Sequence, residues 1–184
     1  MGHKRIAICG AAGTGKTRMI TEINKIFGLE VNPVGSRSVA KNMGYDNPYD
    51  VDKFGRREEF QYLLMSDKVE WEQNHDDFIT DRTTFDVLAY TALHDIRAVN
   101  KQFISMAAKG YERYTHVFFF PMEEFFNLGN DPARMKSEVY HEIYEGVMIS
   151  LMDRYVGVHS AMPIRIGGDE IEERKKNMLE HLVD

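Results

Sequence analysis

The chain has 184 residues, a net charge of −6 and 43% hydrophobic residues, values that fit one globular domain with a buried core. The acidic balance argues against a broad nucleic-acid-binding surface, while a few arginines still allow local contacts. One cysteine, Cys9, excludes an internal disulfide and fits a reducing cytoplasm, and the sequence shows neither a signal-peptide pattern nor an apolar run long enough to span a membrane.

Strand and helix patterns alternate along the chain. Apolar runs predict five strands, and apolar residues at helical spacing predict the helices between them. Because strands that alternate with helices form parallel sheets covered on both faces, we expect an α/β fold of three layers in a single domain over residues 1–184. The predicted strands cover 4–9, 29–32, 77–80, 115–120 and 163–166, and the predicted helices cover 15–27, 55–73, 84–109 with a break near Asn100, a long helix from Pro132 and a last helix after 167–169.

Two features of these helices are specific predictions. Gly28 and Gly110 are expected to stop the helices that precede them. The long helix is expected to carry one apolar stripe. The residues of that stripe are Met135, Val139, Ile143, Val147, Leu151 and Tyr155.

Residues 10–17 match the phosphate-binding loop pattern G-x-x-x-x-G-K-[ST], between a predicted strand and a predicted helix. In this arrangement backbone N–H groups and the helix N-terminus surround the phosphates. We expect ATP and Mg²⁺ as cofactors, with Lys16 at the β- and γ-phosphates and the Thr17 hydroxyl on the metal. A glycine turn before an ordinary helix is the alternative. The residues assigned to nucleotide binding are Gly10, Ala11, Ala12, Gly13, Thr14, Gly15, Lys16, Thr17 and Arg18.

An acid and an arginine, Asp81 and Arg82, follow the third predicted strand directly. Asp81 is expected to bind the metal, through water, or to accept the proton of a substrate hydroxyl, and Arg82 to stabilise charge during phosphoryl transfer. Alternatively, Asp81 only caps the helix that starts near Thr84. Asp86 and Tyr90, one turn apart on that helix, either line an acceptor pocket or lie on a solvated face.

Residues 127–137 are a candidate lid segment. Asp131 and Pro132 are typical of an N-cap and a first helical position. Arg134 and Lys136 then lie in the first turns, where the helix dipole disfavours cations. An incoming phosphate relieves that conflict, so Arg134 is a candidate catalytic residue that closes over the triphosphate. An exposed arginine without function is the alternative.

The glycine loop, Asp81-Arg82 and the lid segment together resemble the small P-loop kinases of the nucleoside and nucleotide class, thymidylate-kinase-like proteins among them. Residues 77–90 are similar to the ribosylnicotinamide-kinase-like ATPases. Residues 37–40 and 43–52 resemble phage-encoded kinases that act on 5-hydroxymethyluracil within DNA. The resemblance implies a P-loop kinase fold and ATP-dependent transfer of the γ-phosphoryl group to a nucleoside- or nucleotide-like acceptor. That acceptor is hydroxymethyluracil in phage DNA, in the host cytoplasm, or a free (deoxy)nucleoside, nucleoside monophosphate or ribosylnicotinamide.

Residues 59–61 also resemble the deoxynucleoside kinases, in which a glutamine of this helix pairs with the base edge. The likeness implies that Gln61 reads the base of the acceptor, since its amide offers a donor and an acceptor. Those kinases usually place a catalytic glutamate after strand two, whereas residues 31–40 contain no acid. Either Asp81 acts as the base or the acceptor is oriented without one, and Arg37 is assigned to an acceptor phosphate.

If the acceptor lies in DNA, its base must be flipped out or met as a single strand. Arg56, Arg57 and residues 109–113 are then candidate contacts, although each also fits a solvated charge cluster. The sequence is compatible with a homodimer and does not fix the oligomeric state.

An NTPase used as a switch or a motor, and an inactive nucleotide-binding adaptor, are the alternatives to a kinase. A GTP switch requires Asn-Lys-x-Asp, and residues 100–103 fail at the fourth position. A motor ATPase requires paired acids at the end of its second conserved strand, where this chain has Arg82 after Asp81. An inactive nucleotide-binding adaptor is disfavoured because Lys16, Thr17 and Asp81 are all present.

Overall fold

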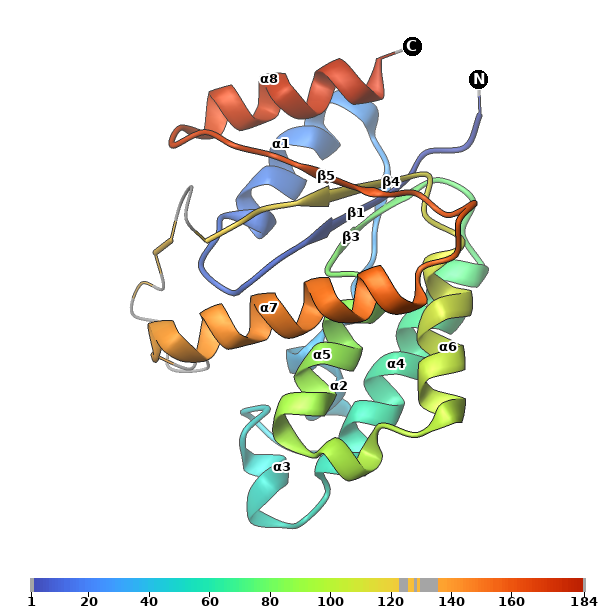
Figure 1. The fold of residues 1–184 in the computed structure, drawn as a ribbon, viewed down its shortest axis with the longest axis vertical. Helices are drawn as coiled ribbons and strands as arrows, with labels where there is room; N and C mark the ends of the chain where they lie inside the picture. The colour runs from blue at the N-terminus through green and yellow to red at the C-terminus, as the bar shows by residue number, and fades with distance from the viewer. Residues whose placement is uncertain (1, 123–125, 128, 130–135, 184) are drawn as a thin grey trace.

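A computed structural model describes residues 2–122, 126–127, 129 and 136–183 (Figure 1). In this part of the chain, five parallel strands form one sheet in the order β2-β3-β1-β4-β5, which confirms the predicted α/β architecture. The central strand β1 pairs with β3 on one side and with β4 on the other, so the carboxyl ends of these three strands lie together. The strands are β1 (Arg5–Cys9), β2 (Glu30–Val31), β3 (Phe78–Asp81), β4 (His116–Phe119) and β5 (Pro163–Arg165).

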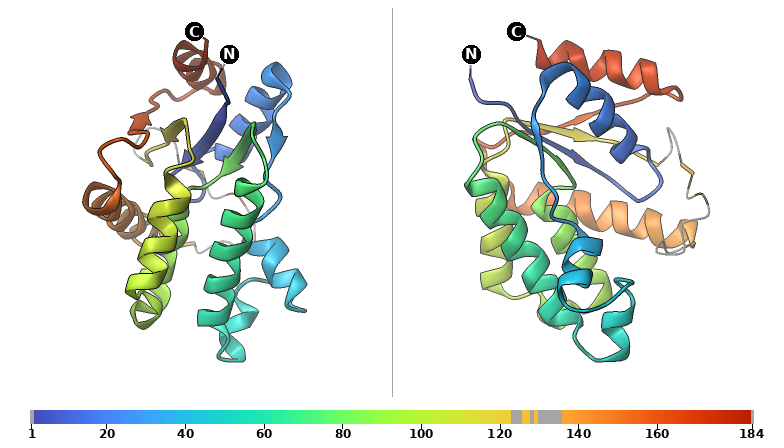
Figure 2. Two further views of the ribbon diagram at one scale, coloured as in Figure 1. Left: turned by 90° about the vertical axis from the view of Figure 1, so that its right-hand side faces the viewer. Right: turned by 180° about the vertical axis from the view of Figure 1, so that it is seen from behind.

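Helices cover both faces of the sheet and so complete the three layers. Helices α1 (Lys16–Phe27) and α8 (Ile171–Leu182) lie side by side on one face, and the remaining helices lie on the other face or extend beyond it (Figures 1 and 2). None of the helices in the described ranges has the length and apolar composition needed to cross a lipid bilayer. The helices beyond α1 and α8 are α2 (Ser36–Asn42), α3 (Asp50–Lys53), α4 (Arg57–Gln73), α5 (Thr84–His94), the 3₁₀ helix η1 (Ile96–Ala98), α6 (Lys101–Tyr111) and α7 (Glu138–Tyr155).

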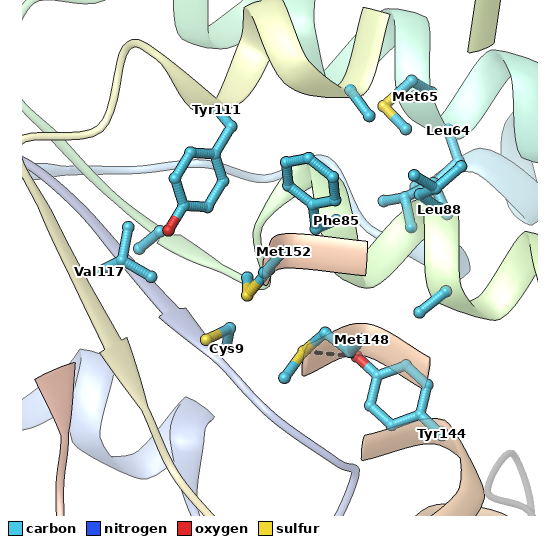
Figure 3. Packing of buried hydrophobic residues seen from close by; sticks show 14 of the residues in the cluster. Cys9, Leu64, Met65, Phe85, Leu88, Tyr111, Val117, Tyr144, Met148 and Met152 are labelled. Carbon is cyan, nitrogen blue, oxygen red and sulfur yellow. Dashed lines mark hydrogen bonds between the residues drawn. The ribbon is translucent and has the colours of Figure 1, made fainter. Parts of the chain in front are cut away.

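Alternation along the strands divides the apolar core in two. Ile6 and Ile8 of β1 pack toward α1 and α8, whereas Ala7 and Cys9 pack toward the opposite face. Cys9 is fully buried with a free thiol, as expected for a packing residue. Figure 3 shows the second core, where Cys9 and Val117 of the sheet meet Leu64 and Met65 of α4, Phe85 and Leu88 of α5, Tyr111 of α6, and Tyr144, Met148 and Met152 of α7.

The predicted order of helices is confirmed with two additions. The break near Asn100 is present, and the Asn100 side chain caps α6 by accepting from the N–H of Phe103 at 2.9 Å. Helices α2 and α3 lie on either side of the irregular stretch around residues 44–48. Both are too short to show the periodicity by which a helix is recognised in sequence.

Gly110 lies inside α6, so the predicted stop at this residue is wrong. A Cβ at Gly110 would lie 2.8 Å from Cγ2 of Thr84 and 2.9 Å from Cγ2 of Val69. Both distances are shorter than van der Waals contact, so the glycine allows α6 to approach α5 and α4 closely. Gly28, in contrast, ends α1 as predicted, with φ 61° and its N–H donating to Asn24 O.

The long helix differs from its prediction. Within the described residues α7 begins at Glu138, and its N-cap Ser137 accepts from the N–H of Tyr140 at 3.2 Å, so Lys136 precedes the helix. The predicted stripe is wrong at its start, because Val139 and Ile143 are 61% and 52% exposed, whereas Val147, Leu151 and Tyr155 are partly buried and pack against the core. Aromatic and methionine side chains turn toward the core instead. The buried residues of α7 are His141, Tyr144, Met148 and Met152.

Candidate active site

The loop between β1 and α1 is folded as its glycines require. Gly10, Gly13 and Gly15 have φ of 124°, 89° and 86°, the left-handed region that favours glycine. A side chain at Gly10 would also overlap the carbonyl oxygen of Phe120, which follows β4. Residues 10–15 therefore form a tight loop at the carboxyl edge of the sheet, where ligands of such folds bind.

Lys16 lies inside this loop. Its side chain is almost fully buried, and its Nζ donates to Ala11 O and to Thr14 Oγ1, the latter at 3.3 Å. Burial, followed by the nearby Arg82 guanidinium, lowers the pKa of Lys16 to about 8. The ammonium group is thus held among loop atoms at the place where a phosphate-binding loop receives its anion.

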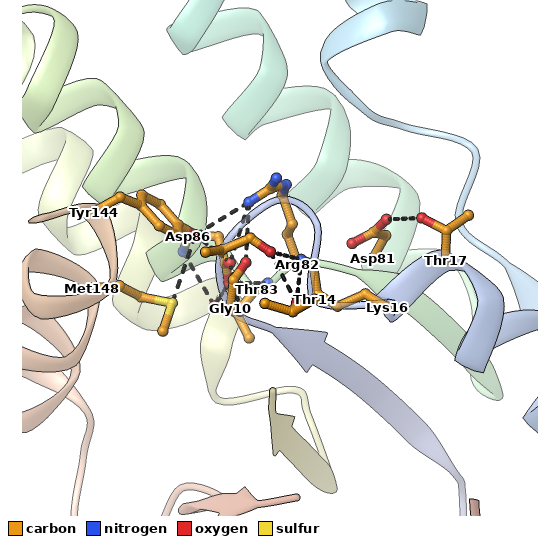
Figure 4. A network of polar contacts seen from close by, with 11 residues as sticks. Gly10, Thr14, Lys16, Thr17, Asp81, Arg82, Thr83, Asp86, Tyr144 and Met148 are labelled. Carbon is orange, nitrogen blue, oxygen red and sulfur yellow. Dashed lines mark hydrogen bonds and ion pairs between the residues drawn. The ribbon is translucent and has the colours of Figure 1, made fainter. Parts of the chain in front are cut away.

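Thr17 and Asp81 meet across the gap between α1 and β3. Thr17 Oγ1 donates to Asp81 Oδ2 at 3.0 Å (Figure 4), and Asp81 pairs in register with Ile8 of β1. Asp81 Oδ1 is buried and has no hydrogen-bond partner among the described residues. One hydroxyl and one carboxylate with an unused oxygen fit the hard oxygen ligands that Mg²⁺ takes beside a polyphosphate, so these residues fit the predicted metal. The helix after β3 is capped by Thr83, not by Asp81, so the capping alternative is wrong.

Arg82 is held in a strained conformation beside the loop. It is the one non-glycine residue of the described ranges with positive φ, 75°, and its N–H donates to Ile8 O at 2.8 Å. Its Nη1 lies 3.5 Å from Gly10 O, 3.2 Å from the Tyr144 hydroxyl and 3.6 Å from Asp86 Oδ1. The surrounding groups therefore fix a cation directly next to the phosphate-binding loop.

Asp86 has a different position from that expected of an acceptor ligand. It is fully buried, so the alternative of a solvated helix face is wrong. Its Oδ2 accepts from the N–H and the hydroxyl of Thr83, both at 2.7 Å, and its Oδ1 accepts from Tyr144 at 2.5 Å and from the N–H of Gly10 at 3.3 Å. The carboxylate thus connects α5, α7 and the glycine loop, and it lies beside the Arg82 guanidinium.

Aromatic side chains from α5 and α7 surround Arg82. The rings of Tyr90 and Tyr144 stack with centroids 4.0 Å apart, and the Arg82 guanidinium lies 4.6 Å from the centroid of Tyr90. Tyr140 extends the cluster, with its hydroxyl 3.1 Å from His94 Nε2. The spacing of 90 with 94 and of 140 with 144 places each pair on one helix face, but only the fold brings the two helices together.

The stretch after β2, where the sequence lacks an acid, leads to a buried polar network. Asn32 Nδ2 donates to Glu72 Oε1 at 3.0 Å, and the same carboxylate pairs with Lys68 at 2.8 Å and accepts from the Tyr114 hydroxyl at 2.8 Å. Glu72 is therefore fully engaged in structural bonds. Asp81 keeps the unused oxygen that a base or metal ligand requires.

Glu145 of α7 is a third carboxylate near the loop, after Asp81 and Asp86, and the sequence did not indicate it. Its Oε2 accepts from the N–H of Met122 at 3.2 Å. Burial raises the pKa of Glu145 above its usual value, and the positive charge of Lys16 opposes that rise. The apolar stripe predicted for α7 does not include the helix face that carries Glu145, so the sequence did not single out this residue.

The other predicted site residues are not brought together with this group. Gln61 of α4 is buried and lines a cavity of about 410 Å³ together with residues of η1 and α6, and its Oε1 has no hydrogen-bond partner among the described residues. Arg37 lies exposed on α2, and Arg18 is exposed on α1. Arg134, and with it most of the predicted lid segment, lies outside the described residues.

A sequence profile for a family described as AAA domain matches residues 5–174, a span that includes the glycine loop, Asp81 and Arg82. The chain belongs to this AAA-domain family. No curated protein sequence matches this AAA domain at a significant level.

Solved structures that resemble this AAA domain share its fold at low sequence identity. Deoxyadenosine kinase from M. mycoides with dCMP and dCDP is 15% identical with a TM-score of 0.64, and the match covers 96% of this chain and 97% of the kinase. Thymidylate kinase from Candida albicans is 13% identical with a TM-score of 0.58, covering 98% and 91%. The NadR protein in complex with NR is 16% identical with a TM-score of 0.65, covering 98% of this chain and 50% of NadR. The likeness supports the predicted group of P-loop kinase folds.

Proposed function

We propose that this AAA domain is an ATP-dependent kinase that transfers the γ-phosphoryl group to a nucleoside- or nucleotide-like acceptor. The observation that carries the proposal is the meeting of Lys16, the Thr17–Asp81 pair and Arg82 at the carboxyl ends of β1 and β3. Phosphoryl transfer depends on positioning and on stabilisation of charge, and this arrangement offers both. The deoxyadenosine and thymidylate kinases with the same fold add support from analogy.

In the proposed reaction the acceptor oxygen bonds to the γ-phosphorus while the bond from that phosphorus to the bridging oxygen of ADP breaks. Lys16 and Arg82 place two cations where negative charge spreads over the transferred group. Asp81 Oδ1, which is unused within the protein, is available for one of two roles: it accepts the proton of an acceptor hydroxyl, or it binds the metal through water. When bound, Mg²⁺ neutralises charge on the β- and γ-phosphates, and Thr17 and Asp81 are the residues that would hold it.

The aromatic cluster around Arg82 supports an acceptor that carries a planar ring. Tyr90 and Tyr140 are only partly buried, their ring centroids lie 6.5 Å apart, and the Arg82 guanidinium contacts the Tyr90 ring. Ring faces of this kind contact a nucleobase or a nicotinamide ring by stacking, and a neighbouring guanidinium strengthens the contact with electron-rich rings. Arg37 and Gln61, which lie outside this cluster, are assigned to the acceptor only by the resemblance to kinases.

The finer question is whether the acceptor is free or part of DNA. The likeness of residues 37–52 to phage kinases supports 5-hydroxymethyluracil in DNA as an acceptor, in the host cytoplasm. However, Arg56 and Arg57, which were candidate DNA contacts, form ion pairs with Glu59 at 2.7 Å and with Asp52 at 2.5 Å. Arginines engaged in this way are less available to phosphates, so we place a free nucleoside-like acceptor first and modified DNA second.

An NTPase that acts as a switch or motor is the rival class, and the AAA description of the family favours it. The two classes differ in whether turnover needs an acceptor. The test measures ADP release by the purified protein, with ATP that carries a label in its γ-phosphate. The reaction is run without an acceptor and with each candidate acceptor in turn. The candidates are nucleosides, nucleoside monophosphates, ribosylnicotinamide and DNA that contains hydroxymethyluracil. Acceptor-dependent release with a labelled product supports the kinase, whereas equal release with and without every acceptor supports the NTPase.

A further inference from the structure

Arg174, in the first turn of α8, reaches the phosphate-binding loop from the C-terminal part of the chain. Its Nη1 donates to Thr14 O at 2.7 Å, its Nε donates to Gly168 O at 2.5 Å, and its guanidinium lies 5.2 Å from the ring centroid of Phe120. The residue is only 2% exposed. A cation in the first turn opposes the helix dipole, and burial of a guanidinium costs free energy that packing alone does not return. The arginine at this position therefore has a role beyond filling space.

The hydrogen bond to Thr14 O orients one peptide plane of the loop. The described residues contain no cis peptide bond, and a trans peptide directs its C=O and its N–H to opposite sides. Because Arg174 holds the Thr14 carbonyl toward α8, the N–H of Gly15 points away from α8. Successive N–H groups of such a loop, that of Gly15 among them, are the donors that surround a phosphate.

The same side chain holds the segment between β5 and α8. Gly168 has φ 117°, and its carbonyl accepts from Arg174, while the neighbouring Gly167 carbonyl accepts from Asn177 Nδ2 at 3.2 Å. One helix thus fixes both the segment after β5 and the Thr14–Gly15 peptide. A displacement of α8 must release or move that peptide.

We propose that Arg174 is a positioning residue for polyphosphate binding, which presents the Gly15 N–H to the nucleotide and couples loop occupation to the docking of α8. The inference rests on the proposed binding of ATP. Coupling between two equilibria is reciprocal, so a bound polyphosphate stabilises the docked position of α8 to the extent that α8 favours binding.

Three variants test the positioning role by calorimetric titration with ATP and Mg²⁺. Arg174→Met removes both hydrogen bonds, and Arg174→Lys keeps the charge without the fork that donates in two directions. Lys176→Met removes a charge from the exposed face of the same helix and is the matched control. We expect Kd for ATP to rise by about tenfold or more in Arg174→Met, by a smaller factor in Arg174→Lys, and by less than about twofold in Lys176→Met.

Hydrogen exchange tests the coupling, because protection of α8 by bound ATP is not expected if Arg174 only stabilises the fold. In the wild type, ATP should slow amide exchange in residues 171–182, and this protection should be lost in Arg174→Met at saturating ATP. An unchanged Kd in Arg174→Met, with urea unfolding confirming that the variant is folded, overturns the positioning role and leaves the kinase proposal intact. If Arg174→Met does not fold, the Kd of Arg174→Lys for ATP tests the positioning role, and an unchanged Kd overturns it. The coupling is then tested by hydrogen exchange in the wild type, where absence of protection of α8 by ATP overturns it. Failure of the wild type to bind ATP overturns the proposed function instead.

Discussion

The Tyr144 hydroxyl accepts a hydrogen bond from Arg82 Nη1 at 3.2 Å and so connects helix α7 to the end of β3. The same hydroxyl donates to Asp86 Oδ1 at 2.5 Å, and this carboxylate lies 3.6 Å from the guanidinium. The three groups form a closed arrangement in which each fixes the other two, with Tyr144 and Asp86 buried and Arg82 partly exposed. The orientation of the proposed catalytic cation therefore depends on how α7 packs.

Tyr144→Phe removes this connection and keeps the ring. We expect kcat to fall by about tenfold, an effect of about 1.4 kcal/mol, because Arg82 and Asp86 each lose a partner. KM for ATP should stay within about twofold, since the loop itself is unchanged. Steady-state kinetics check the expectation, with Tyr155→Phe on the same helix as the control. Equal kcat in Tyr144→Phe and the wild type would show that the hydroxyl does not position Arg82.

Asp81→Asn removes one charge without changing the size of the side chain. We expect phosphoryl transfer to fall by at least about a hundredfold, because the proposed metal ligand and proton acceptor is lost, while ATP binding persists. Label transfer measures the first effect and calorimetry the second. Asp76→Asn, an exposed acid that precedes β3, is the matched control. An unchanged kcat in Asp81→Asn would remove this residue from the reaction.

The lowered pKa of Lys16 gives ATP binding a defined pH dependence. Burial and Arg82 bring this pKa to about 8, and a polyphosphate favours the charged ammonium. Binding therefore raises the pKa and takes up a proton near pH 8, and affinity should fall by up to about tenfold per pH unit above it. Calorimetry in buffers of different ionisation enthalpy measures the uptake.

Lys16→Ala is the control for this titration. It should abolish the proton uptake and cost transfer roughly 2.7–4 kcal/mol, the typical loss of one transition-state donor. Persistent uptake in Lys16→Ala would assign the titration to another group, and near-normal turnover would overturn the role of Lys16 in the reaction.

Gln61→Leu distinguishes a packing role for Gln61 from a role in recognising the base of the acceptor. Gln61 lines the cavity between α4, η1 and α6 with an unpartnered amide oxygen, so an apolar side chain should raise the free energy of unfolding by about 1 kcal/mol. KM for the acceptor should then stay within about twofold. Urea unfolding and acceptor kinetics check both values, and a large rise in KM for the acceptor alone would restore the base-reading role.

The sequence order predicted that the loop, Asp81 and Arg82 lie at one edge of the sheet, because each stands at the end of an apolar strand run, and the structure has them there. Parallel strands bring their carboxyl ends to one edge, so local order along the chain is enough to predict proximity there. Tyr144 and Arg174 could not be found in this way. Each reaches the site from a helix whose rotation is set by packing, and for α7 the predicted apolar stripe lies next to the most buried face, which carries Tyr144 and Met148.

Asp86 shows a related limit. Its position one turn before Tyr90 was visible in the sequence, but not its burial, because Thr83 was not recognised as the N-cap that engages it. The prediction that Gly110 ends its helix is wrong because the role of this glycine depends on Thr84 and Val69 of neighbouring helices, which local sequence does not show. Tertiary contacts decided these positions, whereas local pattern decided the loop.

The left-handed backbone of Arg82 lowers the stability of the fold at a residue whose side chain is proposed to act in the reaction. Glycine would adopt φ 75° without the cost of about 1–3 kcal/mol that other residues incur in this region. Glycine at residue 82 would relieve this cost, but it would also leave Asp86 and Tyr144 without their partner and remove the second cation from the site. Substitutions meant to raise thermal stability should therefore keep Arg82 and be made away from the carboxyl ends of the strands.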